Sequence, residues 1–329
     1  MSTSDFQHQH AAHCESGVIA SIFRNEGVQV SEAMAFGLAS ALSFAYLPFI
    51  KLGGLPLIAY RMPPKFIIKG LAKVFKAKFR FETFRDPSKG KARLDELLDK
   101  QTLVGLQTSV YWLPYFPPDM RFHFNGHNLL AYGRDGNDYL ISDPVCEVTV
   151  TCPSDDLQRA RFAKGALAPK GLLYYPVSIA KNEITSSDVR RAIVKNCRIM
   201  LGPVPIAGIR GMRMLAKKVR ALPNDADETK AFIGHIIRMQ EEIGTGGAGF
   251  RFLYAAFLQE ADGILTGKSL AKFAEELLAI GDQWRGFALA IARMVKGRDA
   301  VSTEALSEQL LVLAKTEHDF FKRLKMAVS

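Results

Sequence analysis

Residues 13–25 read HCESGVIASIFRN, and this stretch sets the start of the fold. Its polar beginning and the apolar residues that follow predict a helix that ends near residues 25–27. Cys14 would then lie at the helix N-terminus, where partial positive charge and unpaired N–H groups favour a thiolate and can hold an oxyanion. Cys14 is therefore a candidate nucleophile, and a small buried structural cysteine is the alternative.

A second polar cluster lies more than a hundred residues further on, where residues 127–143 read HNLLAYGRDGNDYLISD. Two apolar runs around a turn rich in Gly, Asn and Asp predict a β-hairpin, which brings its own ends together. His127 and Asp143 are therefore expected side by side. A cysteine nucleophile needs a base, and the base needs an orienting carboxylate, so Cys14, His127 and Asp143 form a candidate catalytic triad. For Asp143, the alternative is a turn-capping role before Pro144.

These motifs resemble the butirosin biosynthesis protein H family, whose N-terminal domain belongs to the papain-like and bacteriocin-peptidase-like cysteine folds. The resemblance rests on the order and spacing of several segments, and a later glycine-rich segment resembles the helical domain that accompanies this one. The segments are residues 13–17 (HCESG), 31–38 (SEAMAFGL), 113–115 (LPY), the 127–143 hairpin and residues 244–254 (GTGGAGFRFLY).

The expected fold is α+β, with a papain-like domain over residues 1–182 and an all-α domain over residues 183–329. In the first domain the cysteine helix comes before an antiparallel sheet, and only helical patterns follow residue 179. Besides the motifs above, a helical segment is expected from Ser31, further helices at residues 65–77, 91–100 and 155–164, and strands at residues 102–111, 147–151 and 172–177.

The resemblance implies an acyltransferase of secondary-metabolite or specialised-lipid biosynthesis. Such an enzyme takes an acyl group from a carrier-protein thioester and delivers it to an amine. Cys14 would be the acylated nucleophile, His127 the general base and acid, and Asp143 the orienting group. The only cofactor expected is the 4'-phosphopantetheine that the substrate carries. A thioesterase or amidase that uses the same triad with water, and a non-catalytic binding module, remain the alternatives.

The oxyanion donors are less well defined by the sequence. Papain-like enzymes place a glutamine shortly before the cysteine, but this chain has His8 there, with glutamines on both sides. The backbone N–H of Cys14 could supply one donor, and Gln9 or His13 could supply the other. His123 is a second candidate for the base, although the hairpin favours His127.

The chain carries 43 Lys and Arg against 33 Asp and Glu, a net charge of +10. Basic residues gather at residues 65–80 and 210–220, and such faces attract nucleic acid, anionic lipid or an acidic carrier protein. No recognised nucleic-acid module accompanies them. The resemblance favours an acidic acyl carrier protein, with Arg213 and Lys217 among its contacts; a solvated basic face is the alternative.

The glycine-rich run at residues 244–249 lies between two helical patterns. Exposed amides at Gly246 and Gly247, together with Arg251, could contact the phosphate of phosphopantetheine at the next helix N-terminus. The run lacks the Lys-Ser/Thr pair and the preceding strand of a nucleotide-binding loop. A tight packing turn between helices is the alternative.

The four cysteines show neither metal-ligand spacing nor a disulfide framework, which indicates a reducing compartment. His8, His10 and His13 beside Cys14 have donors suited to zinc, but they crowd one short segment, so no metal is expected.

The N-terminus lacks the basic and apolar regions of a secretory signal, so a cytoplasmic location is expected. Residues 33–50 are uncharged and long enough to span a bilayer, yet their Ser, Gly and Pro residues favour a buried core. The chain is therefore not expected to be transmembrane, and the sequence does not indicate its oligomeric state.

Overall fold

The chain crosses three times between two units in the computed structural model, which describes residues 5–242 and 246–329. Unit 1 comprises residues 1–35 and 67–183, and unit 2 comprises residues 36–66 and 184–329. The expected domain boundary after residue 182 lies next to the third crossing, between residues 183 and 184. Residues 36–66, expected in the first domain, belong instead to unit 2.

Unit 1 is built on a six-stranded antiparallel sheet with the strand order β3-β8-β4-β5-β6-β7. The strands expected at residues 102–111 and 172–177 are confirmed as β4 and β8, whereas β3 was not predicted. The bounds are β3 (Lys78–Glu82), β4 (Val104–Thr108), β5 (His127–Asp135), β6 (Asp138–Ser142), β7 (Val150–Pro153) and β8 (Leu173–Ser178).

The predicted hairpin is the pair β5 and β6, which turns at Gly136 with a φ of +57°. Glycine adopts this left-handed conformation without steric cost. Leu130 lies opposite Ser142, and on the other side of β5 His127 lies opposite Thr108 of β4. The open end of the hairpin therefore holds His127, and Asp143 follows β6 directly.

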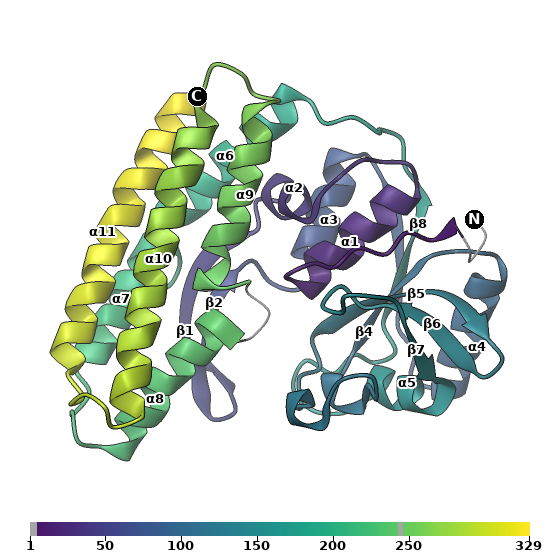
Figure 1. Cartoon of the computed structure of the whole chain (residues 1–329), viewed down its shortest axis with the longest axis horizontal. Coiled ribbons are helices and arrows are strands. Elements are labelled where there is room, and N and C mark those ends of the chain that lie inside the picture. Colours follow the sequence, from purple (N-terminus) through teal and green to yellow (C-terminus); the bar gives the residue numbers. More distant parts are fainter. Residues whose placement is uncertain (1–4, 243–245) are drawn as a thin grey trace. The chain divides into compact units, whose positions relative to one another are not determined.

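Three helices of unit 1, α1, α4 and α5, pack on this sheet. Helix α1 packs on β5 (Figure 1) and buries Val18, Ile19 and Ile22 completely. Ser31 caps α2 as expected, since its hydroxyl accepts the N–H of Met34 at 3.0 Å. The bounds are α1 (Cys14–Asn25), α2 (Glu32–Leu38), α3 (Phe66–Val74), α4 (Pro87–Asp99) and α5 (Ser154–Arg161); α2 and α3 each span a crossing between the units.

Unit 2 contains a two-stranded hairpin from residues 42–61, in addition to the helices expected over residues 183–329. Strands β1 (Leu42–Leu52) and β2 (Leu55–Arg61) pair antiparallel. Gly53 and Gly54 form the turn, with φ values of +58° and +86°. A Gly-Gly pair between two apolar runs is a hairpin signal that the sequence does carry. Residues 33–50 thus form a short helix followed by a strand; they are buried as expected up to Phe44, whereas Phe49 and Ile50 are exposed.

Helices make up the rest of unit 2, as expected, and the long helices α10 and α11 lie side by side (Figure 1). Thr185 caps α6 through a reciprocal capping box with Asp188. The bounds are α6 (Ser186–Leu201), α7 (Gly208–Arg220), α8 (Asp227–Ile237), α9 (Arg251–Asp262), α10 (Leu270–Val295) and α11 (Thr303–Val328).

Candidate active site

Cys14 is the first residue of α1, as the sequence predicts, and 7% of its surface is exposed. His13 is the N-cap residue, with an extended backbone (φ −136°, ψ 132°). Its Nδ1 accepts the N–H of Ser16 at 3.3 Å, which satisfies one amide of the first helical turn. His13 therefore fixes where the helix begins and places the thiol on its first turn.

Glu32 of α2 holds the segment that leads into this helix. Its carboxylate accepts the backbone N–H groups of Ala12 and His13, both at 2.8 Å, and the hydroxyl of Ser16 at 2.9 Å. Burial raises the pKa of Glu32, although these donors oppose the shift. In the sequence, Glu32 stood out only as part of a motif. Its hydrogen bonds to the segment before Cys14 could not be predicted from it.

Gly17 brings α1 against the turn after β6. A Cβ at Gly17 would lie 2.6 Å from the Cβ of Pro144 and 2.7 Å from that of Ala11. Ala11 also donates its N–H to the carbonyl of Pro144 at 2.6 Å. This close approach requires glycine, and it brings the helix that carries Cys14 against the residue that follows Asp143.

The predicted partners His127 and Asp143 are in contact. The Nε2 of His127 lies 2.7 Å from Oδ2 of Asp143, and both side chains are buried. The hydroxyl of Tyr115 donates to the same oxygen at 2.7 Å, and the N–H of Val145 donates to Oδ1 at 3.2 Å. Three donors thus hold the Asp143 carboxylate. Tyr115 was noticed in the sequence without a role.

The pKa of His127 is raised to about 10. Burial alone would lower it, but the Asp143 carboxylate and a hydrogen bond with Cys14 outweigh burial and favour the imidazolium. Since Asp143 engages Nε2, the remaining nitrogen Nδ1 is the one that can face the thiol. The structure therefore brings the hydrogen-bonded pair His127 and Asp143 to the Cys14 thiol in one buried site.

The side-chain oxyanion donors expected from the sequence, Gln9 and His13, are not supported. Gln9 is exposed, and the Nδ1 of His13 is engaged in capping α1. His8 uses both ring nitrogens elsewhere, at 2.8 Å from the hydroxyl of Ser142 and 3.0 Å from the carbonyl of Cys146. Asn128, which the sequence analysis overlooked, has its side-chain nitrogen 4.0 Å from the Cys14 sulfur.

His123 does not take the place of His127. Its ring is exposed and stacks on Tyr111, with centroids 4.0 Å apart.

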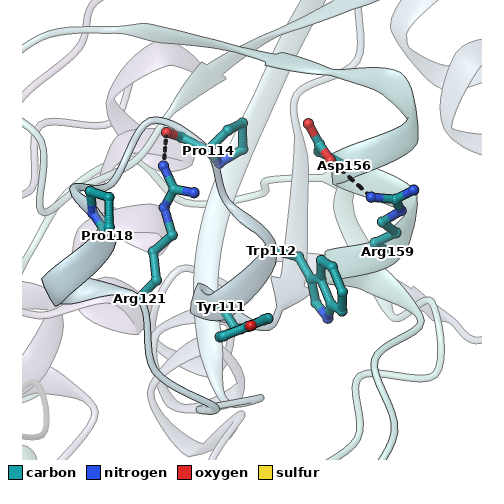
Figure 2. A pocket seen from close by; sticks show the side chains of 7 residues that line it. All are labelled: Tyr111, Trp112, Pro114, Pro118, Arg121, Asp156 and Arg159. Atoms are coloured by element: carbon teal, nitrogen blue, oxygen red, sulfur yellow. Dashed lines mark hydrogen bonds and ion pairs between the residues drawn. The ribbon is translucent and has the colours of Figure 1, made fainter.

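Tyr111 lines a pocket of about 410 Å³ in unit 1 (Figure 2), in which the Arg159 guanidinium lies 5.6 Å from the centre of the Trp112 ring.

Arg121, which also lines this pocket, supports the triad indirectly. Its guanidinium donates to the carbonyl of Pro114 at 2.6 Å (Figure 2) and to the carbonyl of Phe116 at 2.7 Å. These two residues flank Tyr115 in the chain. Arg121 therefore holds the short segment from which the Tyr115 hydroxyl reaches Asp143.

The prediction that Arg251 contacts a phosphate is wrong, because its side chain is buried and paired. Arg251 is fully buried in unit 2, and its Nε and a terminal nitrogen donate to the two oxygens of Glu317 at 2.8 and 2.9 Å. Trp284 donates its indole N–H to the same carboxylate at 2.6 Å. A guanidinium that is paired and buried in this way cannot reach a phosphate in solvent.

The glycine-rich run also has partners within the protein. Glu241 accepts the N–H of Ala248 at 3.1 Å, and the backbone of Gly247 is buried close to Arg285. Gly246 is exposed, whereas Gly244 and Thr245 lie outside the described residues. A carboxylate thus occupies an amide of this run, although not one of the two named as phosphate contacts, which favours the packing-turn alternative.

Arg213 and Lys217 are exposed on α7, one helical turn apart. They share the exposed face of this helix with Arg210, Lys218 and Arg220. The predicted basic face is therefore present.

Over residues 5–242 and 246–329, no group of three or more His, Cys, Asp or Glu side chains is arranged to hold a metal ion. Within the same ranges, no helix combines the length and apolar character needed to cross a membrane.

Comparison with known proteins identifies two family matches. Residues 13–144 match the family described as butirosin biosynthesis protein H, N-terminal, and residues 155–324 match the family described as domain of unknown function DUF4872. A solved structure, described as a C39-like peptidase from Bacillus anthracis, is similar at 15% identity and a TM-score of 0.38, over 54% of this chain and 98% of that chain. No match was found among curated proteins.

The first match covers the cysteine helix, the His127 strand and Asp143, and the second covers more than half of the chain. The resemblance stated from the motifs is thereby confirmed, and the site has the composition and geometry of a cysteine-dependent enzyme. The chain belongs to the DUF4872 family, and its N-terminal part is a domain of the butirosin biosynthesis protein H type.

Proposed function

We propose that the protein is an acyltransferase that moves an acyl group from a carrier-protein thioester, through an acyl-enzyme on Cys14, to an amine. The observation that carries this proposal is the buried contact of His127 with both Asp143 and Cys14. The N-terminal family is named for a biosynthetic protein, which suits a synthetic role better than a degradative one. Exchange of a thioester onto a cysteine is also nearly isoenergetic.

In the proposed reaction, the Cys14 thiolate attacks the thioester carbonyl, and the tetrahedral intermediate expels the carrier thiol. His127, held as an imidazolium by Asp143, gives its proton to the departing sulfur. The neutral imidazole then takes a proton from the attacking amine. Collapse of the second intermediate releases the amide and returns the thiolate.

The other three cysteines are poor competitors for this role. Burial raises the pKa of Cys146, Cys152 and Cys197 to about 12 in each case. At neutral pH these groups are therefore thiols, which are weak nucleophiles. Cys14 differs from them in lying on a helix N-terminus and in contacting a histidine.

The proposed donor is an acidic carrier protein that delivers phosphopantetheine. The exposed basic residues Arg213 and Lys217 on α7 supply a surface of the right charge. Binding through such exposed charges weakens as ionic strength rises, so transfer from the carrier should slow in high salt.

The test is a chase of the acyl-enzyme. Protein loaded from a panel of acyl carrier thioesters is mixed with amines or with buffer alone, and the products are identified by mass. We expect an amide product and faster discharge with an amine than with water. Equal discharge rates and free acid as the only product would identify a hydrolase and overturn the proposal. Cys14→Ala should form no acyl-enzyme, and Cys152→Ala, the matched control, should behave as wild type.

A further inference from the structure

We propose that the side-chain amide of Asn128 is the oxyanion donor of this site, working together with the backbone N–H of Cys14. Attack of a thiolate on an acyl group leaves a negative charge on the carbonyl oxygen, and enzymes stabilise it with prearranged N–H donors. The inference deepens the proposed function and rests on Cys14 being the nucleophile. It gives the oxyanion role to a residue that follows His127 directly in β5.

The contacts of Asn128 fix the direction of its amide. Its Nδ2 donates to the carbonyl of Gly126 at 3.2 Å, and its Oδ1 accepts the hydroxyl of Tyr174 at 3.1 Å. Since a backbone carbonyl can only accept, the NH₂ group must be the end that faces Gly126. One N–H is used there, and the second is left for the thiol side, where Nδ2 lies 4.0 Å from Sγ of Cys14.

That separation suits an oxyanion better than it suits the sulfur. Oxyanion donors lie about 3 Å from the oxygen, and this oxygen is one carbon away from the attacking sulfur, so a donor is expected at roughly 4 Å from the sulfur. Asn128 is only 6% exposed, so few water molecules compete for its N–H.

The second donor follows from the start of α1. The backbone N–H of Cys14 belongs to the first turn of the helix, where amides have no partner within the helix. The side-chain amide of Asn128 and the backbone N–H of Cys14 would both donate to the oxyanion on the acyl carbon that the Cys14 sulfur attacks.

Tyr174 is the positioning residue for this amide. It lies on β8, Asn128 lies on β5, and β4 runs between them. Gly105 of β4 pairs with Tyr174, and a Cβ at Gly105 would lie 2.2 Å from a carbon of the tyrosine ring. The absence of a side chain at Gly105 therefore lets the fully buried Tyr174 reach across β4 to Asn128.

The thiolate electron pair forms the S–C bond, and the carbonyl π electrons move to the oxygen, which accepts hydrogen bonds from Asn128 and Cys14. Collapse restores the C=O bond and expels the leaving group. A carrier thiol leaves as a thiolate and takes its proton from His127.

The test compares two reactions of the same thiol in the full-length chain. Acylation by p-nitrophenyl acetate passes through an oxyanion, whereas alkylation by iodoacetamide does not. In Asn128→Ala we expect acylation to fall by about 10²- to 10³-fold, while alkylation stays near the wild-type rate. Tyr174→Phe, which keeps Asn128 but releases its amide, should show a smaller loss of acylation only.

Asn125→Ala is the matched control. Asn125 is also buried, and its Nδ2 donates to the carbonyls of Lys164 and Ala166, so the variant should lose stability without a selective loss of acylation. Equal acylation of wild type and Asn128→Ala would overturn the inference. A parallel fall of alkylation would also overturn it, because Asn128 would then act on the thiol. The ester assay needs neither a carrier nor an amine. It therefore tests Asn128 even if the carrier and amine experiments show that the protein is not the proposed acyltransferase.

Discussion

At the scale of single residues, the site depends on a charge that is buried but well satisfied. Asp143 is fully buried and accepts hydrogen bonds from His127, Tyr115 and the backbone of Val145. Its charge raises the pKa of His127 from 6.5 to about 10. The protonated pair therefore stabilises the fold fully below about pH 6.5, and this contribution is lost as the pH rises through 10.

The first prediction concerns the protonation of His127. In Asp143→Asn, the pKa of His127 should fall by about 1–3 units, because the opposite charge is gone while the shape is nearly kept. NMR titration of the imidazole signals measures this shift directly. An unchanged pKa in the variant would show that Asp143 is not what holds the proton.

The sequence could supply the three triad residues, because their chemistry is recognisable and a hairpin brings two of them together. It could not supply the residues that orient them. Tyr115, Glu32 and Asn128 have roles that depend on contacts with partners far along the chain. Gln9 and His13 lie near Cys14 in sequence, but Gln9 is exposed and the Nδ1 of His13 caps α1, so nearness in sequence is a weaker guide than nearness in space.

At the scale of elements, the position of α1 against the turn after β6 decides whether the thiol meets its base. Gly17 permits the contact with Pro144, and Glu32 of α2 secures the segment before the helix. Helix α1 also buries an apolar face on β5. The sequence predicted this helix well, because a polar start at His13 is followed by a run of mostly apolar residues.

The second prediction tests this placement. Gly17→Ala should destabilise the protein by about 1–3 kcal/mol, because the added methyl group overlaps Pro144 and Ala11. It should also slow the reactions of Cys14. Urea unfolding and thiol alkylation measure the two effects.

The control for this substitution is Gly286→Ala on α10, where nothing lies within 4 Å of an added Cβ. This variant should be stabilised by about 0.5–1 kcal/mol, since alanine favours the helix. If Gly17→Ala were as stable and as reactive as the control, the proposed tight contact would be absent.

At the scale of the whole molecule, the hairpin β1–β2 makes unit 2 discontinuous in sequence. Phe44 and Tyr60 of this hairpin are buried against Trp284 of α10. The backbone N–H of Tyr46 also donates to the carbonyl of Ile206, ahead of α7. Sequence order alone suggested a single boundary near residue 182, because nothing local in residues 36–66 reveals partners that come so much later.

The third prediction follows from this connectivity. A fragment of residues 1–182 should aggregate or bind a hydrophobic dye, because the hairpin would expose side chains that unit 2 buries. Co-expression with residues 183–329 should restore solubility. Size-exclusion chromatography and dye fluorescence measure both outcomes, and a monomeric fragment that does not bind the dye would contradict the assignment of the hairpin to unit 2.

The central claim is that Cys14 is the activated nucleophile of an acyl-transfer site. The most direct measurement is intact-mass analysis and peptide mapping after incubation with an acyl pantetheine thioester. We predict one acyl group per chain, on the peptide that contains Cys14, absent in Cys14→Ala and retained in Cys146→Ala. Acylation at Cys146 instead, or a Cys14→Ala variant that still forms the acyl-enzyme, would contradict the account.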